Sequence, residues 1–308
     1  MALDNLGRTI ILGVADNKLV KNFVRKYGMK LGAKRFIAGE YLEQTIAEVK
    51  RLNEEGFVVT LDHVGESVST REETIEATDE AIMILDAIAT NQLNSNLSIK
   101  LTQLGLVIDP ELCYENVRRI VQQAKKYDNF VRIDIEDAAV VQITIELFKR
   151  VQAEFSNKHV GLALQAYLYR TEDDIRDLDS LGTNLRLIKG AYKEAKEIAF
   201  PHKKDVDRNF INIIKIHLLN GNYTAIATHH QLIVDEIKTF VEKNSIPYSL
   251  FEFQMLYGIS NDLQRQLLKE GYTVRIYTPY GKEWFPYFSR RIAERPANAF
   301  FVLKGLFK

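Results

Sequence analysis

Short apolar segments alternate with helical segments eight times along this chain, and no other feature constrains the fold as strongly. The apolar segments are "FVVTLDHVG", "LSIKLTQLG", "FVRIDIED", "HVGLALQAY", "LRLIKGAY", "YTAIATHH", "YSLFEFQM" and "YTVRIYTPYG". Each is followed by a stretch such as "PELCYENVRRIVQQAKKY", whose apolar residues recur every three or four positions, as in an amphipathic helix. The nearly continuous apolar runs indicate parallel strands that are buried on both faces.

Eight strand–helix units in about 250 residues fit a closed (β/α)8 barrel. The alternative is an open, doubly wound sheet, which usually carries G-x-G-x-x-G after its first strand. The sequence contains no such motif at that place. We therefore expect an α/β fold, a distorted (β/α)8 TIM-like barrel spanning residues 57–308. Residues 1–56 show helical periodicity that ends at Gly56, and we expect them to form an N-terminal helical segment packed on the barrel.

Charge and composition exclude several classes of protein. The 41 basic and 41 acidic residues balance, so nothing favours nucleic-acid binding. Cys113 is the single cysteine, which excludes a disulfide framework. The start, "MALDNLGRTIILGVADN", lacks the basic and apolar regions of a signal peptide, and no apolar run approaches the roughly 20 residues of a membrane span. We expect a soluble, cytoplasmic protein.

Polar side chains gather at the expected carboxyl ends of the strands, where barrel enzymes carry their active sites. They are Asp62, Lys100, Asp134, Glu136, Gln165, Arg186, Lys189, Thr228, His229, Glu252, Gln254, Arg275 and Tyr277. Any one of them could belong to an ion pair that caps the barrel, because an unpaired buried charge is costly. Their repetition over most strands indicates a functional site. The pair His229–His230 would point to opposite faces of a strand, so no metal site is expected.

The last helix carries two adjacent arginines in "YFSRRIAE". One interpretation is an exposed helix with an ion pair between Arg291 and Glu294, worth about 0.2–0.5 kcal/mol. The other is a carboxylate-binding pair, because two guanidinium groups can grip a carboxylate with forked hydrogen bonds when acids hold them in place. Glu294 and Asp134 could supply those acids.

At these residues the chain resembles the proline dehydrogenases, flavin enzymes that oxidise L-proline. The matching segments occur in order from about residue 57: "SIKLTQLG", "RIDIEDA", "LALQAY", "LRLIKGAYKE", "ATHH", "FEFQMLYG", "VRIYTPYG" and "YFSRRIAERPAN". The resemblance is to the short form of the family, without a DNA-binding region or a fused aldehyde dehydrogenase domain. It implies FAD as the cofactor and 1-pyrroline-5-carboxylate as the product.

The resemblance also implies roles for individual residues. Those matching the substrate site are Lys100, Asp134, Tyr277, Tyr287, Arg290, Arg291 and Glu294, with the arginine pair on the proline carboxylate and the tyrosines on its ring. Arg186 matches an arginine near the reactive flavin nitrogen, and Arg186 and Tyr277 are the expected catalytic residues. Segments lining the FAD contain Gln165, Arg186, Lys189, Gly190, Ala191, Tyr192, Thr228, His229, Glu252 and Gln254.

Further implications concern substrate choice and electron transfer. A smaller residue replaces Tyr277 in a branch that prefers hydroxyproline, so the tyrosine favours proline. The family implies a quinone acceptor, a visit to the inner face of the membrane, and handover of the product to a separate pyrroline-5-carboxylate dehydrogenase. The C-terminal "AFFVLKGLFK" is a weak membrane-contact candidate. Two rival interpretations remain: a lyase or aldolase with Lys100 or Lys189 as a Schiff base, and a non-catalytic amino-acid sensor.

Overall fold

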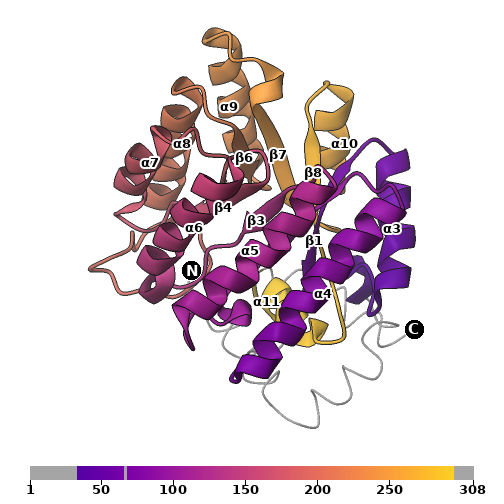
Figure 1. The fold of residues 1–308 in the computed structure, drawn as a ribbon. Coiled ribbons are helices and arrows are strands. Elements are labelled where there is room, and N and C mark those ends of the chain that lie inside the picture. Colours follow the sequence, from indigo (N-terminus) through magenta and orange to yellow (C-terminus); the bar gives the residue numbers. More distant parts are fainter. Residues whose placement is uncertain (1–32, 66–67, 295–308) are drawn as a thin grey trace.

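A closed barrel of parallel strands forms the centre of the molecule (Figure 1). The computed structural model describes residues 33–65 and 68–294. In this part of the chain the strands follow one another around the barrel in sequence order: β1 (Val58–His63), β2 (Ser95–Ile99), β3 (Val131–Ile133), β4 (Val160–Gln165), β5 (Leu185–Ile188), β6 (Thr224–Ala227), β7 (Phe251–Leu256) and β8 (Val274–Tyr280). β8 pairs with β1 and closes the barrel. The predicted fold is confirmed.

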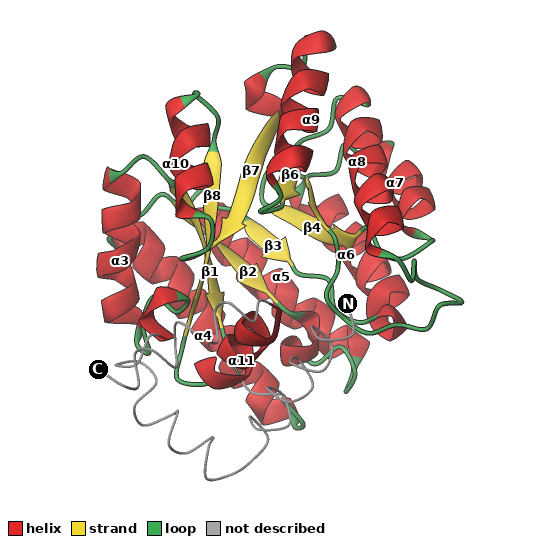
Figure 2. Ribbon diagram, turned by 180° about the vertical axis from the view of Figure 1, so that it is seen from behind, coloured by secondary structure: helices red, strands yellow, loops and turns green. Residues whose placement is uncertain are grey.

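Helices lie outside the strands and cover their outer faces (Figures 1 and 2). The described helices are α3 (Leu42–Glu54), α4 (Arg71–Thr90), α5 (Pro110–Lys126), α6 (Val141–Phe155), α7 (Thr171–Asp179), α8 (Lys203–Leu219), α9 (Gln231–Lys243), α10 (Asn261–Lys269) and α11 (Trp284–Glu294). One continuous apolar core joins the strands to the helices around them. Because both faces of each strand are buried, the strands read as apolar runs in the sequence.

Local signals fix where two of these helices begin. Thr70 caps α4 by accepting from the amide of Glu73, while the Glu73 side chain accepts from the amide of Thr70. This reciprocal capping box satisfies amides that the first helical turn leaves without partners. Asp109 caps α5, and Pro110 occupies the first turn, where its missing N–H costs nothing. Both helices start where the sequence predicted.

The second strand is shorter than the segment "LSIKLTQLG" suggested. β2 ends at Ile99, and residues Leu101–Leu104 form a short 3-10 helix, η2, that stops at Gly105. Gly105 has a φ of 102°, a left-handed conformation that glycine adopts readily. The apolar residues of η2 are buried, so packing against α4 and α5, and not sheet pairing, explains their hydrophobicity. Lys100 therefore lies where the chain leaves the sheet.

The last helix packs differently from the others. α11 lies at one end of the barrel, beneath the strands in Figures 1 and 2. A second, smaller apolar cluster joins Trp284, Phe285 and Phe288 of α11 to residues that include Phe36 and Val64. Val64 directly follows the last residue of β1, so α11 lies at the carboxyl end of the strands. The helix with the arginine pair is thus held at the barrel mouth.

Residues 33–56 pack on the barrel, and this is the part of the expected N-terminal segment that the structure describes; residues 1–32 lie outside the described residues. The hydroxyl of Tyr257, after β7, donates to Glu48 Oε1 of α3 at 2.9 Å. Trp284 Nε1 donates to Glu40 Oε1 at 2.9 Å. The backbone of Gly258 meets that of Arg35 so closely that an added Cβ would lie 1.6 Å from the Arg35 carbonyl oxygen.

We expect Gly258→Ala to destabilise the fold more than Gly271→Ala does. Both glycines have positive φ, 71° and 87°, but a Cβ on Gly271 would meet nothing within 4 Å. Left-handed backbone costs an alanine about 1–2 kcal/mol at either position, and the overlap at Gly258 adds about 1–3 kcal/mol. Urea unfolding of both variants measures the difference in their free energies of unfolding. Equal losses would contradict the close packing of residues 33–35 on the β7–α10 loop.

Candidate active site

A largely buried carboxylate, Asp134, joins side chains from several strands at the carboxyl end of the barrel. It directly follows β3. Its Oδ1 accepts from Arg186 Nη1 at 2.5 Å and from Ser98 Oγ at 3.1 Å. Its Oδ2 accepts from the Tyr277 hydroxyl at 2.7 Å and lies 3.6 Å from Lys100 Nζ. These residues come from β2, β3, β5 and β8 or the positions just after them, so barrel closure creates the cluster.

A second carboxylate completes the charge balance. Asp62 of β1 accepts from Lys100 Nζ at 2.5 Å. Asp62 and Arg186 are each 3% exposed, so the cluster lies largely out of water. Two carboxylates, Asp62 and Asp134, face two cations, Lys100 and Arg186, and the four charges cancel. We call these residues, with Ser98 and Tyr277, the mouth cluster.

Mutual charge keeps the mouth cluster ionised. Burial raises the pKa of Asp134, but the charges of Arg186 and Lys100 outweigh burial and place that pKa below its usual value. Burial lowers the pKa of Lys100, yet Asp62 and Asp134 raise it above its ordinary value. Burial and the charge of Asp134 both raise the pKa of Tyr277 well above its ordinary value. At neutral pH Asp134 is therefore anionic, Lys100 is cationic and Tyr277 keeps its proton.

Gln165, the last residue of β4, is fixed beside this cluster. Its Nε2 donates to the Glu136 carbonyl oxygen at 2.6 Å, and its Oε1 is buried without a hydrogen-bond partner among the described residues. The Glu136 side chain accepts from the Thr102 amide at 3.0 Å and from the Thr102 hydroxyl at 2.6 Å. Burial raises the pKa of Glu136 above its ordinary value. These contacts set the position of Gln165 in advance of any ligand.

The loop after β5 carries four of the predicted cofactor residues. Lys189 Nζ is bound to Asp207 Oδ1. Gly190 has a φ of 105° and faces the ring of Tyr167, which a Cβ would overlap, so only glycine fits here. Ala191 and Tyr192 are exposed. Burial raises the pKa of Tyr192, and so do the charges of Glu136 and Asp134, while the charges of Lys100 and Arg290 lower it.

Thr228 and His229 follow β6. Thr228 is 4% exposed, and its hydroxyl accepts from the His230 amide at 3.2 Å. His229 Nε2 accepts from the Leu256 amide at 2.9 Å, which ties it to the end of β7. No group of three or more histidine, cysteine, aspartate or glutamate side chains among residues 33–65 and 68–294 could hold a metal ion.

Two strand residues lie at the opposite end from the one we expected. Glu252 and Arg275 line a cavity together with Asn94 and Asn184, the residues directly before β2 and β5, so they lie toward the amino end of the barrel. Arg275 Nε donates to Glu252 Oε1 at 2.7 Å, and Gln254 Nε2 donates to the same oxygen at 2.6 Å. The expected cofactor contacts of Glu252 and Gln254 stay predictions.

The arginine pair occupies the end of α11. Tyr287 is 7% exposed, and Arg291 Cζ lies 5.2 Å from the centre of its ring, so the expected neighbourhood of these two residues is confirmed. Arg290 is exposed, and its charge reaches the Tyr192 hydroxyl. The side chain of Glu294 lies outside the described residues. Contacts of the arginine pair with Asp134 or Glu294 stay predictions.

One residue of the mouth cluster was missed in the sequence. Ser98 Oγ donates to Asp134 Oδ1 at 3.1 Å and accepts from Arg186 Nη2 at 3.0 Å. It lies two residues before Lys100, so both side chains point to the same face of the chain. That spacing is the signal that could have indicated it. A serine inside an apolar strand is too common to single out alone.

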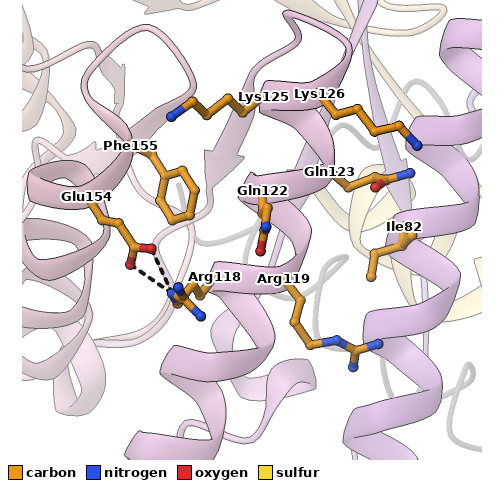
Figure 3. Close-up of a pocket in the computed structure, with 9 residues that line it drawn as sticks. All are labelled: Ile82, Arg118, Arg119, Gln122, Gln123, Lys125, Lys126, Glu154 and Phe155. Atoms are coloured by element: carbon orange, nitrogen blue, oxygen red, sulfur yellow. Dashed lines mark hydrogen bonds and ion pairs between the residues drawn. The ribbon is translucent and has the colours of Figure 1, made fainter.

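A groove on the outside of the barrel has no part in this site (Figure 3). It lies between α4, α5 and α6, with a volume of about 810 Å³. Its arginines already have partners: Arg118 Nε binds Glu154 Oε1 at 2.8 Å, and Arg119 Nη2 binds Asp79 Oδ1 at 2.6 Å. Solvated ion pairs of this kind are ordinary on helix surfaces.

Comparison with known proteins identifies relatives over nearly the whole chain. The family model described as proline dehydrogenase matches residues 45–304. Proline dehydrogenase 1 of Bacillus subtilis is 47% identical over 301 residues, which cover 98% of this chain and 99% of the relative. Proline dehydrogenase of Deinococcus radiodurans is 43% identical over 309 residues, which cover 99% of each chain.

A solved structure shares the fold. Proline utilization A (PutA) from Bdellovibrio bacteriovorus, inactivated by N-propargylglycine, superposes with a TM-score of 0.83 at 25% identity. The match covers 90% of this chain and 34% of the PutA chain. This chain therefore spans about a third of that longer protein, in contrast to its full-length match with the Bacillus and Deinococcus enzymes.

The barrel and the mouth cluster define an enzyme whose chemistry takes place at the carboxyl ends of the strands. The family match and the high identity to full-length relatives make the assignment specific. The chain belongs to the proline dehydrogenase family. It is an FAD-dependent oxidoreductase that oxidises L-proline in proline catabolism, as the sequence motifs implied.

The residues at the mouth fit a flavin. Gln165 Oε1 and Arg186 Nε are buried atoms for which the described residues supply no hydrogen-bond partner. Buried polar atoms normally have partners, so a polar ligand is expected to supply them. A flavin ring offers both an N–H donor and carbonyl and nitrogen acceptors, which match an amide oxygen and a guanidinium N–H.

We expect Asp134→Asn to reduce stability by about 3–5 kcal/mol at pH 7, because it removes one partner of a buried ion pair. The folded pKa of Asp134 is depressed, so its contribution is complete above the unfolded value of about 3.9. The contribution is lost as the pH falls through the folded pKa. Urea unfolding should therefore show the same gap between variant and parent at pH 7 and pH 5, and a smaller gap below about pH 4.

Asp177→Asn provides the control. Asp177 binds Lys149 at 2.5 Å, but its side chain is 66% exposed, and such pairs contribute less than about 1 kcal/mol. A loss at Asp134 no larger than the loss at Asp177 would show that the mouth cluster does not hold the strands together.

Proposed function

We propose that Arg290 and Arg291 bind the carboxylate of L-proline at the barrel mouth, with Lys100 beside them. The position of α11 at the carboxyl end of the strands supports this. The charges of Arg290 and Lys100 both lower the pKa of Tyr192, which is consistent with positive charge gathered at this end. Two forked guanidinium groups suit a planar carboxylate better than a single lysine does. Glu294 steadies the pair from the next turn of the helix.

Tyr277 and Tyr287 enclose the proline ring in this proposal. The Tyr277 hydroxyl is fixed by Asp134, and Arg186 Cζ lies 5.0 Å from the centre of its ring. A tyrosine held at both its ring and its hydroxyl cannot swing aside for a larger substrate. It leaves little room for a ring hydroxyl, so proline is preferred to hydroxyproline.

The chain's own residues position the reacting carbon and tune charge. A bound FAD supplies the acceptor for the hydride that leaves the ring carbon beside the proline nitrogen. Arg186 provides positive charge at the cofactor's reactive nitrogen and thereby favours the reduced form. The cofactor is lined, in this proposal, by Gln165, the segment Lys189–Tyr192, Thr228, His229 and Gln254. Binding the carboxylate at a fixed place orients the reacting carbon, which is an effect of proximity.

Electrons then pass to a quinone, and the product goes to a separate pyrroline-5-carboxylate dehydrogenase; the family relationship supports both proposals. The protein acts in the cytoplasm and visits the inner face of the membrane. Among the helices that the structure describes, none is long and apolar enough to cross a bilayer. The C-terminal segment "AFFVLKGLFK", the candidate for membrane contact, lies outside the described residues.

The partners of Lys100 and Lys189 disfavour a Schiff-base mechanism. A lysine that attacks a carbonyl must lose its proton near neutral pH. Lys100 has a raised pKa because Asp62 and Asp134 stabilise its charged form, and Lys189 is bound to Asp207. The buried Gln165 and Arg186 atoms that await a partner likewise argue against a sensor that has lost its cofactor.

We expect the purified protein to show flavin absorbance that bleaches when L-proline is added without oxygen. Bleaching establishes the cofactor and the reduction by proline in one experiment. Hydroxyproline is the matched comparison, and it should bleach the bands more slowly at equal concentration. A protein that is colourless and takes up no added FAD would overturn the proposal, whereas bands that persist with proline would require another substrate.

We expect Arg291→Ala to lower kcat/KM for proline about 10- to 100-fold, mainly through KM. Loss of hydrogen bonds to a charged group costs about 1.5–3 kcal/mol, and binding shared by ground and transition states appears in KM. Arg176→Ala is the control, since Arg176 lies on α7, is 56% exposed and binds only Glu172 in the described part of the chain. Steady-state kinetics at several proline concentrations measure both. An unchanged KM in Arg291→Ala would contradict the carboxylate site.

A further inference from the structure

A second polar cavity lies at the amino end of the barrel, opposite the mouth cluster. Its volume is about 240 Å³, and Arg132, Arg275, Glu252, Asn96 and Tyr223 are among the residues that line it. Asn94 and Asn184, which directly precede β2 and β5, also line it and place it at that end. The reaction of the family takes place at the other end, so this cavity has no assigned role.

The charges around this cavity do not cancel. Arg275 Nε donates to Glu252 Oε1 at 2.7 Å and forms an ion pair. Arg132 binds only neutral groups among the described residues. Its Nη1 donates to the carbonyl oxygens of Leu162 and Asn184, at 3.1 and 2.6 Å, and its Nη2 donates to Asn184 Oδ1 at 2.5 Å. Two guanidinium charges and one carboxylate leave one positive charge in excess.

The other titratable groups do not remove this excess. Asp128, at the rim, is exposed and binds Lys158 at 2.7 Å. Burial lowers the pKa of His217 to about 3, with a smaller effect from the Arg132 charge, so this histidine is neutral. Burial raises the pKa of Tyr223 above its ordinary value, so its hydroxyl keeps its proton. The positive charges of Arg186 and Arg275 lower the pKa of Arg132, and the negative charge of Glu252 raises it.

Burial of the excess charge on Arg132 costs free energy. Arg132 is 2% exposed, and its Nε has no acceptor among the described residues. The ring of Phe130 lies 4.8 Å from Arg132 Cζ, which compensates only part of a buried charge. Burial, followed by the charge of Arg186, lowers the pKa of Arg132 to about 9. Arginine keeps its proton even so, and a buried cation is stable only beside an anion.

We propose that this cavity binds a small monovalent anion, either chloride or a short carboxylate. A single negative charge matches the single positive charge in excess, and the space suits a small ion. Asn96 supplies a donor, because its Oδ1 accepts from the Thr60 hydroxyl at 2.5 Å and the described residues offer no acceptor to its Nδ2. The anion bridges strands β2, β3 and β8 and stabilises the closed barrel from its amino end.

Bromide, a heavy substitute for chloride, tests the site directly. We expect crystals of the FAD-loaded protein, grown without other halides and soaked in bromide, to show an anomalous peak in this cavity beside a guanidinium group. Asn96→Asp should abolish the peak, because the new carboxylate supplies the negative charge while keeping the acceptor for Thr60. Asn261→Asp, the same change on the exposed first turn of α10, should retain it. Water density alone in parent crystals soaked in bromide and, separately, in acetate would overturn the proposal.

Thermal unfolding tests the site in solution. At constant ionic strength, replacing a bulky organic sulfonate by chloride should raise the melting temperature of the parent and of Asn261→Asp by about 2 °C or more. Asn96→Asp should show no rise. A rise with acetate but not with chloride assigns the site to a carboxylate. Equal shifts in all three proteins, or none in the parent, would contradict a specific anion site.

Discussion

The carboxylate of Asp134 holds together the mouth cluster at the carboxyl end of the barrel. It binds Arg186, Ser98 and Tyr277 and lies near Lys100, so four strands converge on one group. Because these charges are largely buried, each is stable only while its partners stay in place. The same bonds orient Arg186 and Tyr277, the two residues proposed to face the cofactor and the substrate. Stability and function thus depend on one set of contacts.

Buried charges are balanced differently at the two ends of the barrel. At the carboxyl end, Asp62 and Asp134 balance Lys100 and Arg186, and the remaining buried polar atoms await a ligand. At the amino end, Glu252 balances Arg275 and leaves Arg132 with neutral partners. The carboxyl end can therefore take up a neutral flavin ring without leaving one of these buried charges unpaired. At the amino end, the unpaired charge of Arg132 is the reason for the proposed anion.

Periodicity in the sequence was enough to predict the barrel, because strands buried on both faces differ plainly from helices with one apolar face. Boundaries were less certain. The apolar residues after Lys100 form η2 and not a longer strand, since burial against α4 and α5 requires the same hydrophobicity as a sheet does. Ser98 was missed because its importance arises from Asp134 and Arg186, which lie 36 and 88 residues further along the chain.

The sequence did not show where along the barrel axis, between its amino and carboxyl ends, a strand side chain lies. Glu252 and Gln254 read alike in "FEFQM", yet Glu252 lies at the amino end with Arg275. The tilt and stagger of the strands set this position along the axis, and both follow from closure of the whole sheet. The sequence by itself determined the strand–helix order, the family motifs and the arginine pair, because these depend on local pattern. Only the tertiary structure decided which charges meet, because pairing joins residues that are distant in the chain.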